Sequence, residues 1–355
     1  MAKILIKNGR IWDGTRFLRA DVLTEGALIA AIGENLTASD ALVYDAAGKT
    51  VSAGFVDVHT HMWGVSTDKF GIQAEISCLP FGVTVAADAS GEQGDRALLD
   101  RFLLKTAVFV KSSIRGNRAD FEKTQGRMTA FGSRVVGIKV YFDTTMTEAS
   151  DATPLREICD FAHEKGLRVM VHCSHSPIPM AEILEVLGTG DILTHAFHGG
   201  ENNAAEDGFE SMRRAQRRGV VIDAGLAGHV HTDFSVLRRA VACGVLPDTV
   251  STDITRYSAF QRGGRYGMTM CMSIARHLGM PEEALFAAVT KNAAKALGKE
   301  NEWGMLRVGG HADIAVLSEN GTGFDLTDKA GNRIASDAGY QCELTVLNGQ
   351  VVYAH

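Results

Sequence analysis

The sequence predicts an α/β protein: a (β/α)8, TIM-like barrel with a small β-sandwich domain built from both ends of the chain. Two observations lead to this fold class. Residues 53–302 alternate short apolar strands with amphipathic helices, which indicates a parallel sheet buried on both faces. Residues 1–52 and 303–355 instead contain strand-like segments broken by Asn-Gly turns. About 250 residues of the alternating pattern is the usual size of such a barrel.

An open, doubly wound sheet is the alternative that the alternating pattern leaves. No GxGxxG motif follows the first strand of the alternating region, which argues against a nucleotide-binding sheet of that kind. We therefore prefer the barrel, with residues 53–302 as one domain and residues 1–52 plus 303–355 as the β-sandwich.

The composition is that of an ordinary globular protein. Hydrophobic residues make up 45% and charged residues 22% of the 355 residues, and the net charge of -6 suggests neither a nucleic acid nor a membrane as partner. The N-terminus, MAKILIKNGRIWDG, lacks the apolar core of a signal peptide, so we expect a cytoplasmic protein. Six scattered cysteines without a CxxC pair are predicted to be reduced thiols. Association into a homo-oligomer is left open.

The expected elements follow in chain order. The terminal strands lie in the segments ILIKNGRIWDG, RADVLTEGALIAAIG, LVYDAAGKTVS, ADIAVLS and CELTVLNGQVVY. The expected barrel strands are FVDVHTH, VTVAADA, RVVGIKVYF, RVMVHCSH, DILTHAFH, VVIDAG and TVSTDI. Helical patterns include LREICDFAHEKG, FSVLRRAVACG, MTMCMSIARHLG and PEEALFAAVTKNAAKALG, and we expect the last two to close the barrel.

The segment VSAGFVDVHTHM, residues 51–62, organises the candidate chemistry. His59 and His61 lie two positions apart on an expected strand, so both imidazoles should point to the same side. One strand would then give two nitrogen ligands to a single divalent metal. A pair of half-exposed strand histidines without a ligand role remains the alternative, because short motifs often match by chance.

Other expected strands carry ligand-type side chains near their carboxyl ends, where barrel enzymes have their active sites. This set consists of His59, His61, Lys139, His172, His195 and Asp253. Lys139 is a charge in an apolar strand, and an unpaired buried ammonium costs several kcal/mol. Burial lowers the pKa of a lysine, and its neutral amine can add carbon dioxide to form a carbamate that bridges two metals. An ion pair between Lys139 and a carboxylate such as Asp253, without metals, is the alternative.

The sequence resembles the amidohydrolase superfamily over nearly its whole length. The segments KILIKNGRIWDG, AGFVDVHTHM, GIKVY, MVHCSH, ILTHAFHG, VSTD and GMLRVGGHADIAVL carry this resemblance in the family's order. Within the superfamily the chain looks closest to dihydroorotase-like and deacetylase-like members that use two metals and a carboxylated lysine. One departure is the run at residues 290–294, which lacks the proline that the family often has near its last helix.

The resemblance implies a role for each candidate. His59, His61 and Asp253 would bind the more buried metal, His172 and His195 would bind the second, and carboxylated Lys139 would bridge them. A hydroxide shared by the metals would be the nucleophile, with Asp253 transferring its proton to the leaving group. Zinc is the expected metal, and manganese or iron are alternatives.

Two further histidines compete with these candidates. His175 follows His172 by three positions, and His198 follows His195 by the same spacing. We prefer His172 because it continues an apolar strand before the turn residues begin. We also prefer His195 over His198.

Substrate-binding residues are less well determined. Arg115, in SSIRGNRAD, and Arg256, in TDITRYSAF, are candidates for clamping a substrate carboxylate, although both suit a structural ion pair as well. His229 and His231 follow the strand VVIDAG on a loop. We select His229 as a substrate contact and leave the role of His231 open.

The predicted function is metal-dependent hydrolysis of an amide or ester bond in a small acylated acid, such as an N-acyl amino acid or an O-acetyl hydroxy acid. Opening of a cyclic amide, as in dihydroorotase, is the main alternative. Deamination of a purine-like ring ranks lower. A non-catalytic scaffold is disfavoured, because a scaffold has no need of six metal-compatible residues at one face.

Overall fold

The computed structural model describes residues 2–62, 71–91, 99–227, 230–261 and 265–355. Seven parallel strands form the sheet that carries the candidate site, in the order β14-β13-β12-β11-β8-β7-β6. Their bounds are Phe55–Thr60 (β6), Val83–Gly91 (β7), Lys105–Lys111 (β8), Val135–Tyr141 (β11), Arg168–His172 (β12), Ile192–Thr194 (β13) and Val221–Ile222 (β14). Strands and helices alternate along this region, which confirms the predicted α/β class.

The segment 249–254, expected to be a strand, instead makes isolated parallel bridges. Thr249 pairs with Asp223, just beyond β14, and Ile254 pairs with Thr60, the last residue of β6. Backbone hydrogen bonds follow on both sides, from Leu226 N to Ser251 O and from His61 N to Ile254 O. This segment therefore contacts both edges of the parallel sheet, and it carries Asp253.

The apolar side chains of the parallel strands belong to two separate hydrophobic cores, one on each face of the sheet. Ile138 and Val140 of β11 belong to the large core under the helices, whereas Val56 and Val58 of β6 belong to a second, inner core. Both faces are therefore buried, as expected for a parallel sheet. Lys139, between Ile138 and Val140, points to the inner side.

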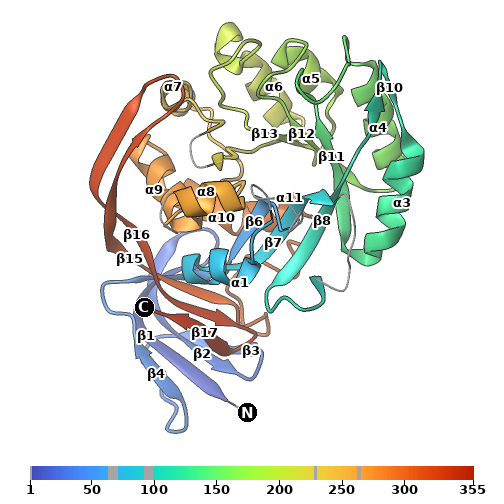
Figure 1. Ribbon diagram of the computed structural model, residues 1–355. Helices are drawn as coiled ribbons and strands as arrows, with labels where there is room; N and C mark the ends of the chain where they lie inside the picture. The colour runs from blue at the N-terminus through green and yellow to red at the C-terminus, as the bar shows by residue number, and fades with distance from the viewer. Residues whose placement is uncertain (1, 63–70, 92–98, 228–229, 262–264) are drawn as a thin grey trace.

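Helices cover the outside of the parallel sheet (Figure 1). The α-helices are α1 Ala74–Ser77, α3 Phe121–Phe131, α4 Thr153–Glu164, α5 Met180–Val186, α6 Glu210–Arg217, α7 Phe234–Ala242, α8 Arg256–Gln261, α9 Met268–His277, α10 Glu282–Val289 and α11 Lys291–Ala296. Short 3-10 turns occur at Leu79–Phe81, Gly132–Arg134 and Ala204–Asp207, and β9 (Ile114–Arg115) pairs with β10 (Arg118–Ala119). Within the described residues, no helix is both long and apolar enough to cross a membrane.

The last expected helix is split in two, contrary to the sequence prediction. The backbone leaves helical geometry at Thr290, with φ -126° and ψ -101°, and α11 begins at the next residue. The Thr290 hydroxyl donates to the carbonyl of Phe286 and lies 3.3 Å from Trp12 Nε1. A tertiary contact with the N-terminal strand therefore accompanies the break.

Strands from both ends of the chain form one eight-stranded, mostly antiparallel sheet. These strands are Lys3–Trp12 (β1), Phe17–Glu25 (β2), Leu28–Gly33 (β3), Leu42–Asp45 (β4), Thr50–Ala53 (β5), Ile314–Thr327 (β15), Arg333–Leu347 (β16) and Gln350–Ala354 (β17). Their order is β17-β16-β15-β5-β1-β2-β3, and β4 pairs with β1. Hydrogen bonds thus join the strands into a single sheet, where the predicted sandwich implied two, and the sheet has a core of its own.

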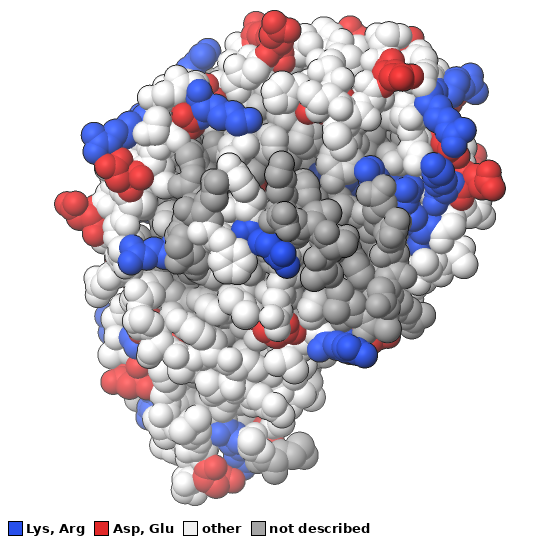
Figure 2. All heavy atoms as spheres, in the orientation of Figure 1, with Lys and Arg blue, Asp and Glu red and all other residues white. Residues whose placement is uncertain are grey.

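Figure 1 shows the blue N-terminal strands beside the red C-terminal ones, below the parallel sheet. The long β15–β16 hairpin rises from this sheet beside α9, where Tyr340 N donates to Ser273 Oγ at 2.8 Å. Basic and acidic side chains lie close to one another around the outline of the face in Figure 2.

Aromatic side chains join the terminal sheet to the helices. Phe286 of α10 is fully buried, and its ring centroid lies 5.2 Å from Phe17, 6.0 Å from Tyr340 and 6.5 Å from Phe55. Two of these partners lie in the terminal sheet, on β2 and β16, and the third lies in the parallel sheet, on β6. The ring of Phe286 therefore contacts both sheets.

We expect Phe286→Ala to lower the free energy of unfolding by about 3–5 kcal/mol, because it leaves a cavity where the two sheets meet. Urea denaturation followed by circular dichroism measures the change. Phe260→Ala is the matched control, because that side chain on α8 is 67% exposed and its loss should change stability by less than about 0.5 kcal/mol. Equal unfolding midpoints for the two variants would contradict this role.

Candidate metal centre

The HxH motif brings two imidazoles to one carboxylate. His59 Nε2 lies 3.2 Å, and His61 Nε2 lies 2.7 Å, from Oδ1 of Asp253. All three side chains are buried, and their ligand-type atoms lie within 4.8 Å of one another. The period of two along the strand thus places both rings on one side, and the bridging segment 249–254 supplies the carboxylate.

Hydrogen bonds to the second ring nitrogen orient these histidines. The Thr194 hydroxyl donates to Asp223 Oδ2 at 2.7 Å, so its oxygen is left to accept from His59 Nδ1 at 2.9 Å. His59 Nε2 then keeps its lone pair, which is the form that binds metal. His61 Nδ1 lies 3.1 Å from Ser90 Oγ, which holds that ring in the same way.

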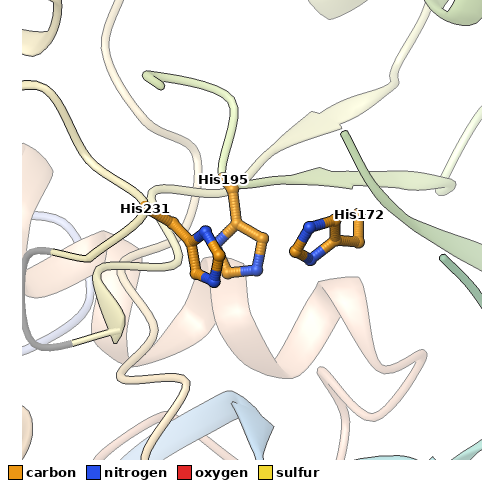
Figure 3. A group of neighbouring side chains, drawn as sticks. All are labelled: His172, His195 and His231. Atoms are coloured by element: carbon orange, nitrogen blue, oxygen red, sulfur yellow. The ribbon is translucent and has the colours of Figure 1, made fainter. Parts of the chain in front are cut away.

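A second group lies beside the first and consists of His172, His195 and His231, whose ligand-type atoms also lie within 4.8 Å of one another. Figure 3 shows the three rings gathered together. His195 Nδ1 donates to Gly225 O at 2.6 Å, which leaves Nε2 for a ligand. His172 Nε2 is instead engaged by Ser174 Oγ at 2.7 Å and Asp143 Oδ2 at 3.2 Å, which leaves Nδ1.

Two of the candidate ligands adopt a strained backbone conformation. His195 and Asp253 have φ angles of 60° and 46°, a left-handed conformation that non-glycine residues rarely adopt. Gly225 is required by the close approach of its neighbours, since a Cβ there would lie 2.7 Å from His195 Nδ1 and 2.5 Å from Thr194 Oγ1. The unfavourable backbone conformations of His195 and Asp253 are therefore maintained by the surrounding structure, which holds their side chains at the site.

Lys139 lies beside the first group. Its side chain is fully buried, and Nζ lies 3.1 Å from His59 Nε2. Burial lowers the pKa of Lys139 to about 8. Burial is also the main cause that lowers the pKa values of His59, His172 and His195. The positive charge of Lys139 lowers all three pKa values further. The lysine therefore faces members of both groups.

Asp253 and the histidines with a lowered pKa are in the protonation states that metal binding needs. Burial alone would raise the pKa of Asp253, but the neighbouring His59 and His61 hold it well below its ordinary value, so it is ionised. Burial lowers the pKa of His231 to about 3, so this imidazole is neutral as well. Neutral imidazoles and an ionised carboxylate are the donor set of zinc and similar divalent metals, and the two groups fit such ions.

The two competing histidines lie outside both groups. His175 is half exposed on its side chain, and its Nδ1 lies 3.2 Å from Asp143 Oδ2. His198 is buried, and neither of its ring nitrogens has a hydrogen-bond partner among the described residues. The geometry therefore favours His172 and His195 over these neighbours.

The structure describes two of the three predicted substrate contacts, and their surroundings differ. Arg115 is about three-quarters exposed and pairs with Asp120 at 3.1 Å, which fits the structural alternative. Arg256 lines a cavity of about 460 Å³, together with Met62, the residue after His61. His229 lies outside the described residues.

The sequence reasoning missed the residues that orient the ligands. Asp143, Thr194 and Asp223 are buried polar side chains in or next to the strands that carry the candidates. An isolated Asp or Thr in an apolar strand was the only available signal, and many such residues have no role in a site. It also left His231 unassigned, although the structure places this ring 4.3 Å from His195.

Comparison with known proteins assigns a family to this arrangement. Residues 50–352 match the family model of the amidohydrolases. The chain belongs to the amidohydrolase family. This confirms the resemblance that the sequence motifs indicated, and the protein is a hydrolase enzyme.

Two amidohydrolases similar to this chain carry the name deacetylase. One, from Agrobacterium fabrum, is 29% identical over 336 residues, covering 88% of this chain and 81% of that protein. Another, from Enterococcus faecalis, is 27% identical and covers 98% of both chains. The crystal structure of a dihydroorotase superposes with a TM-score of 0.86 at 25% identity, covering 100% of this chain and 99% of that one.

Proposed function

We propose that this amidohydrolase removes the acyl group from a small acylated acid, either an N-acyl amino acid or an O-acetyl hydroxy acid. One observation carries the proposal: the group of His59, His61 and Asp253 lies directly beside a second histidine group, with His195 Nε2 3.7 Å from Asp253 Oδ2. The buried Lys139 lies at the same place, with Nζ 3.1 Å from His59 Nε2. The two similar deacetylases support the choice of an acyl substrate, because they align with most of the chain.

Two divalent metals, with zinc as the expected metal, would occupy the two groups. His59, His61 and Asp253 would hold one ion, and His172 and His195 would hold the other. When bound, such ions polarise the scissile carbonyl and lower the pKa of the attacking water to about 7.

Carboxylation of Lys139 is part of the proposal. A protonated amine beside His59 Nε2 would repel a cation, and removing it from water is costly. The lowered pKa makes the neutral amine available for reaction with carbon dioxide. The new N–C bond, with loss of one proton, turns the side chain into an anionic oxygen ligand that suits a position between two cations.

The protein's own residues would handle the proton. Asp253 is ionised and buried, and its two oxygens face His61 at 2.7 Å and His195 at 3.7 Å. It is placed to take the proton from the attacking water and to deliver it to the leaving nitrogen or oxygen. Arg256 would bind the substrate carboxylate from the cavity next to Met62.

We also propose that the bridging segment 249–254 is the eighth strand of a closed (β/α)8 barrel. Its bridges to Asp223 and Thr60 support closure, since they involve both edges of the sheet. The division into residues 53–302 and residues 1–52 plus 303–355 remains a prediction.

Hydrolysis of a cyclic amide is the second candidate. The dihydroorotase that superposes over the full chain supports it, because ring opening needs the same attack on an amide carbonyl. The two candidates differ only in the shape of the substrate that the site accepts.

A substrate screen of the zinc-loaded enzyme tests the proposal. We expect turnover of N-acetyl amino acids of one handedness or of O-acetyl hydroxy acids, and little turnover of dihydroorotate, other cyclic amides or adenine. The Asp253→Asn variant, purified in parallel, controls for contaminating hydrolases. Turnover of ring amides alone would contradict the deacetylase assignment. A metal content near zero after metal-supplemented expression would indicate a non-catalytic scaffold.

A further inference from the structure

His231 completes a triangle of imidazoles with the two histidines already assigned to the second metal position. Its ring centroid lies 4.3 Å from that of His195 and 5.0 Å from that of His172, while the latter two are 4.6 Å apart. The rings come from separate places in the chain and converge in Figure 3. Three imidazoles this close would normally be separated by water or held by a common partner.

The loop that carries His231 is anchored on both sides. Before it, Ala227 N donates to Thr252 O at 3.0 Å, next to Asp253. After it, Asp233 N donates to Phe197 O at 3.0 Å, two residues beyond His195. Both anchors connect the loop to the segments that carry other candidate ligands, so the position of His231 is set by the site itself.

Asp233 strengthens the second anchor. Its Oδ1 accepts from the backbone nitrogens of Ser235 and Val236 and caps α7, and it also accepts from Asn332 Nδ2 at 3.1 Å. Because Asp233 is held in this way two residues after His231, the His231 imidazole can be presented without a large entropic cost on binding.

The His231 ring has an unused nitrogen. Nδ1 is buried and has no hydrogen-bond partner among the described residues. Leaving a buried polar atom unpaired costs about 1–3 kcal/mol. A cation in the space between the three rings would give this imidazole a partner.

We propose that His231 is a third imidazole ligand of the second metal position. This inference rests on the proposed two-metal function and adds a ligand to it. The second position then offers three neutral nitrogens, whereas the first offers two nitrogens and the carboxylate of Asp253. Imidazole-rich sites suit zinc, and carboxylate oxygens also accept harder ions such as manganese, so the two positions differ in metal preference.

Metal retention in His231→Ala and His231→Asn tests this assignment. Each zinc-loaded protein is dialysed against graded chelator concentrations, and bound zinc is measured by elemental analysis. Loss of an outer hydrogen-bond partner of a ligand costs roughly 10- to 100-fold in metal affinity, so loss of a ligand should cost at least as much. We expect the wild type to retain two zinc ions under conditions where the variants retain one.

Cobalt substitution gives a second readout that does not depend on turnover. Removing a ligand changes the visible absorption of a bound cobalt ion, so the His231 variants should differ from the wild type in band position or intensity. His277→Asn is the control, because His277 is an exposed residue at the end of α9 whose ring packs against Phe324 of β15 and belongs to neither candidate ligand group. Circular dichroism and thermal unfolding of the metal-free proteins show whether each variant folds, and His231→Asn keeps a polar side chain should the alanine variant fail.

The outcomes separate the two claims. Equal zinc retention and equal cobalt spectra, together with a raised KM, would make His231 a substrate contact and overturn this assignment, but would leave the proposed function standing. A wild type that binds no metal would overturn both.

Discussion

Asp253→Asn is expected to lower turnover by about three orders of magnitude or more, because the amide cannot take a proton from the attacking water. The asparagine oxygen can still face His59 and His61, whose Nε2 atoms lie 3.2 and 2.7 Å from the present carboxylate. Metal content should therefore fall little. Steady-state kinetics on the best substrate from the screen, with elemental analysis of the same samples, checks both expectations.

Asp120→Asn is the matched control for this variant. Asp120 pairs with the exposed Arg115, so the same chemical change there should leave turnover within about twofold, as expected for a surface ion pair. Unchanged activity of Asp253→Asn would remove this residue from proton transfer. Complete loss of metal would instead show that Asp253 is needed mainly as a ligand.

Lys139→Ala is expected to lose both turnover and the second metal. The side chain is fully buried beside His59, so its removal deletes the proposed bridge and leaves a space. Adding acetate should restore part of the activity, because a small carboxylate can enter that space and replace the carbamate oxygens. Kinetics and metal content, each measured with and without acetate, check the expectation.

A further measurement identifies the role of the amine. Wild-type protein exposed to isotopically labelled bicarbonate should show a carbamate signal by NMR, and Lys139→Ala should not. Lys123→Ala, at an exposed position on α3, controls for the loss of a lysine elsewhere. A wild type without a carbamate signal, or a Lys139→Ala variant that retains two metals and full turnover, would contradict the bridging role.

Local sequence patterns were sufficient for the elements that depend only on nearby residues. The alternation in FVDVHTH set the side of the strand to which His59 and His61 point, because side chains on a strand repeat every two residues. Apolar runs predicted the buried parallel strands, and Lys139 stood out as a charge within one of them. The family motifs identify the amidohydrolase fold without any information on tertiary contacts.

Other features depend on residues that are far apart in the chain. The last predicted helix is interrupted at Thr290, whose hydroxyl lies beside Trp12 of the first strand, and nothing near Thr290 in the sequence signals that partner. The segment 249–254 reads as a strand, but the structure shows only isolated bridges there. Arg115 has the right residue type for a substrate clamp, yet its position gives it Asp120 as partner.

The sequence alone determined the chemical types of the candidate ligands and the side of the strand to which His59 and His61 point, because residue identity and the period of a strand are local properties. Only the tertiary structure decided which nitrogen of each histidine is left for a metal, and that His231 joins His172 and His195. Those outcomes depend on hydrogen bonds that the histidines make with Thr194, Asp143 and Gly225, and on the hydrogen bonds of Ala227 and Asp233 on either side of His231. Such contacts form only when distant segments pack together.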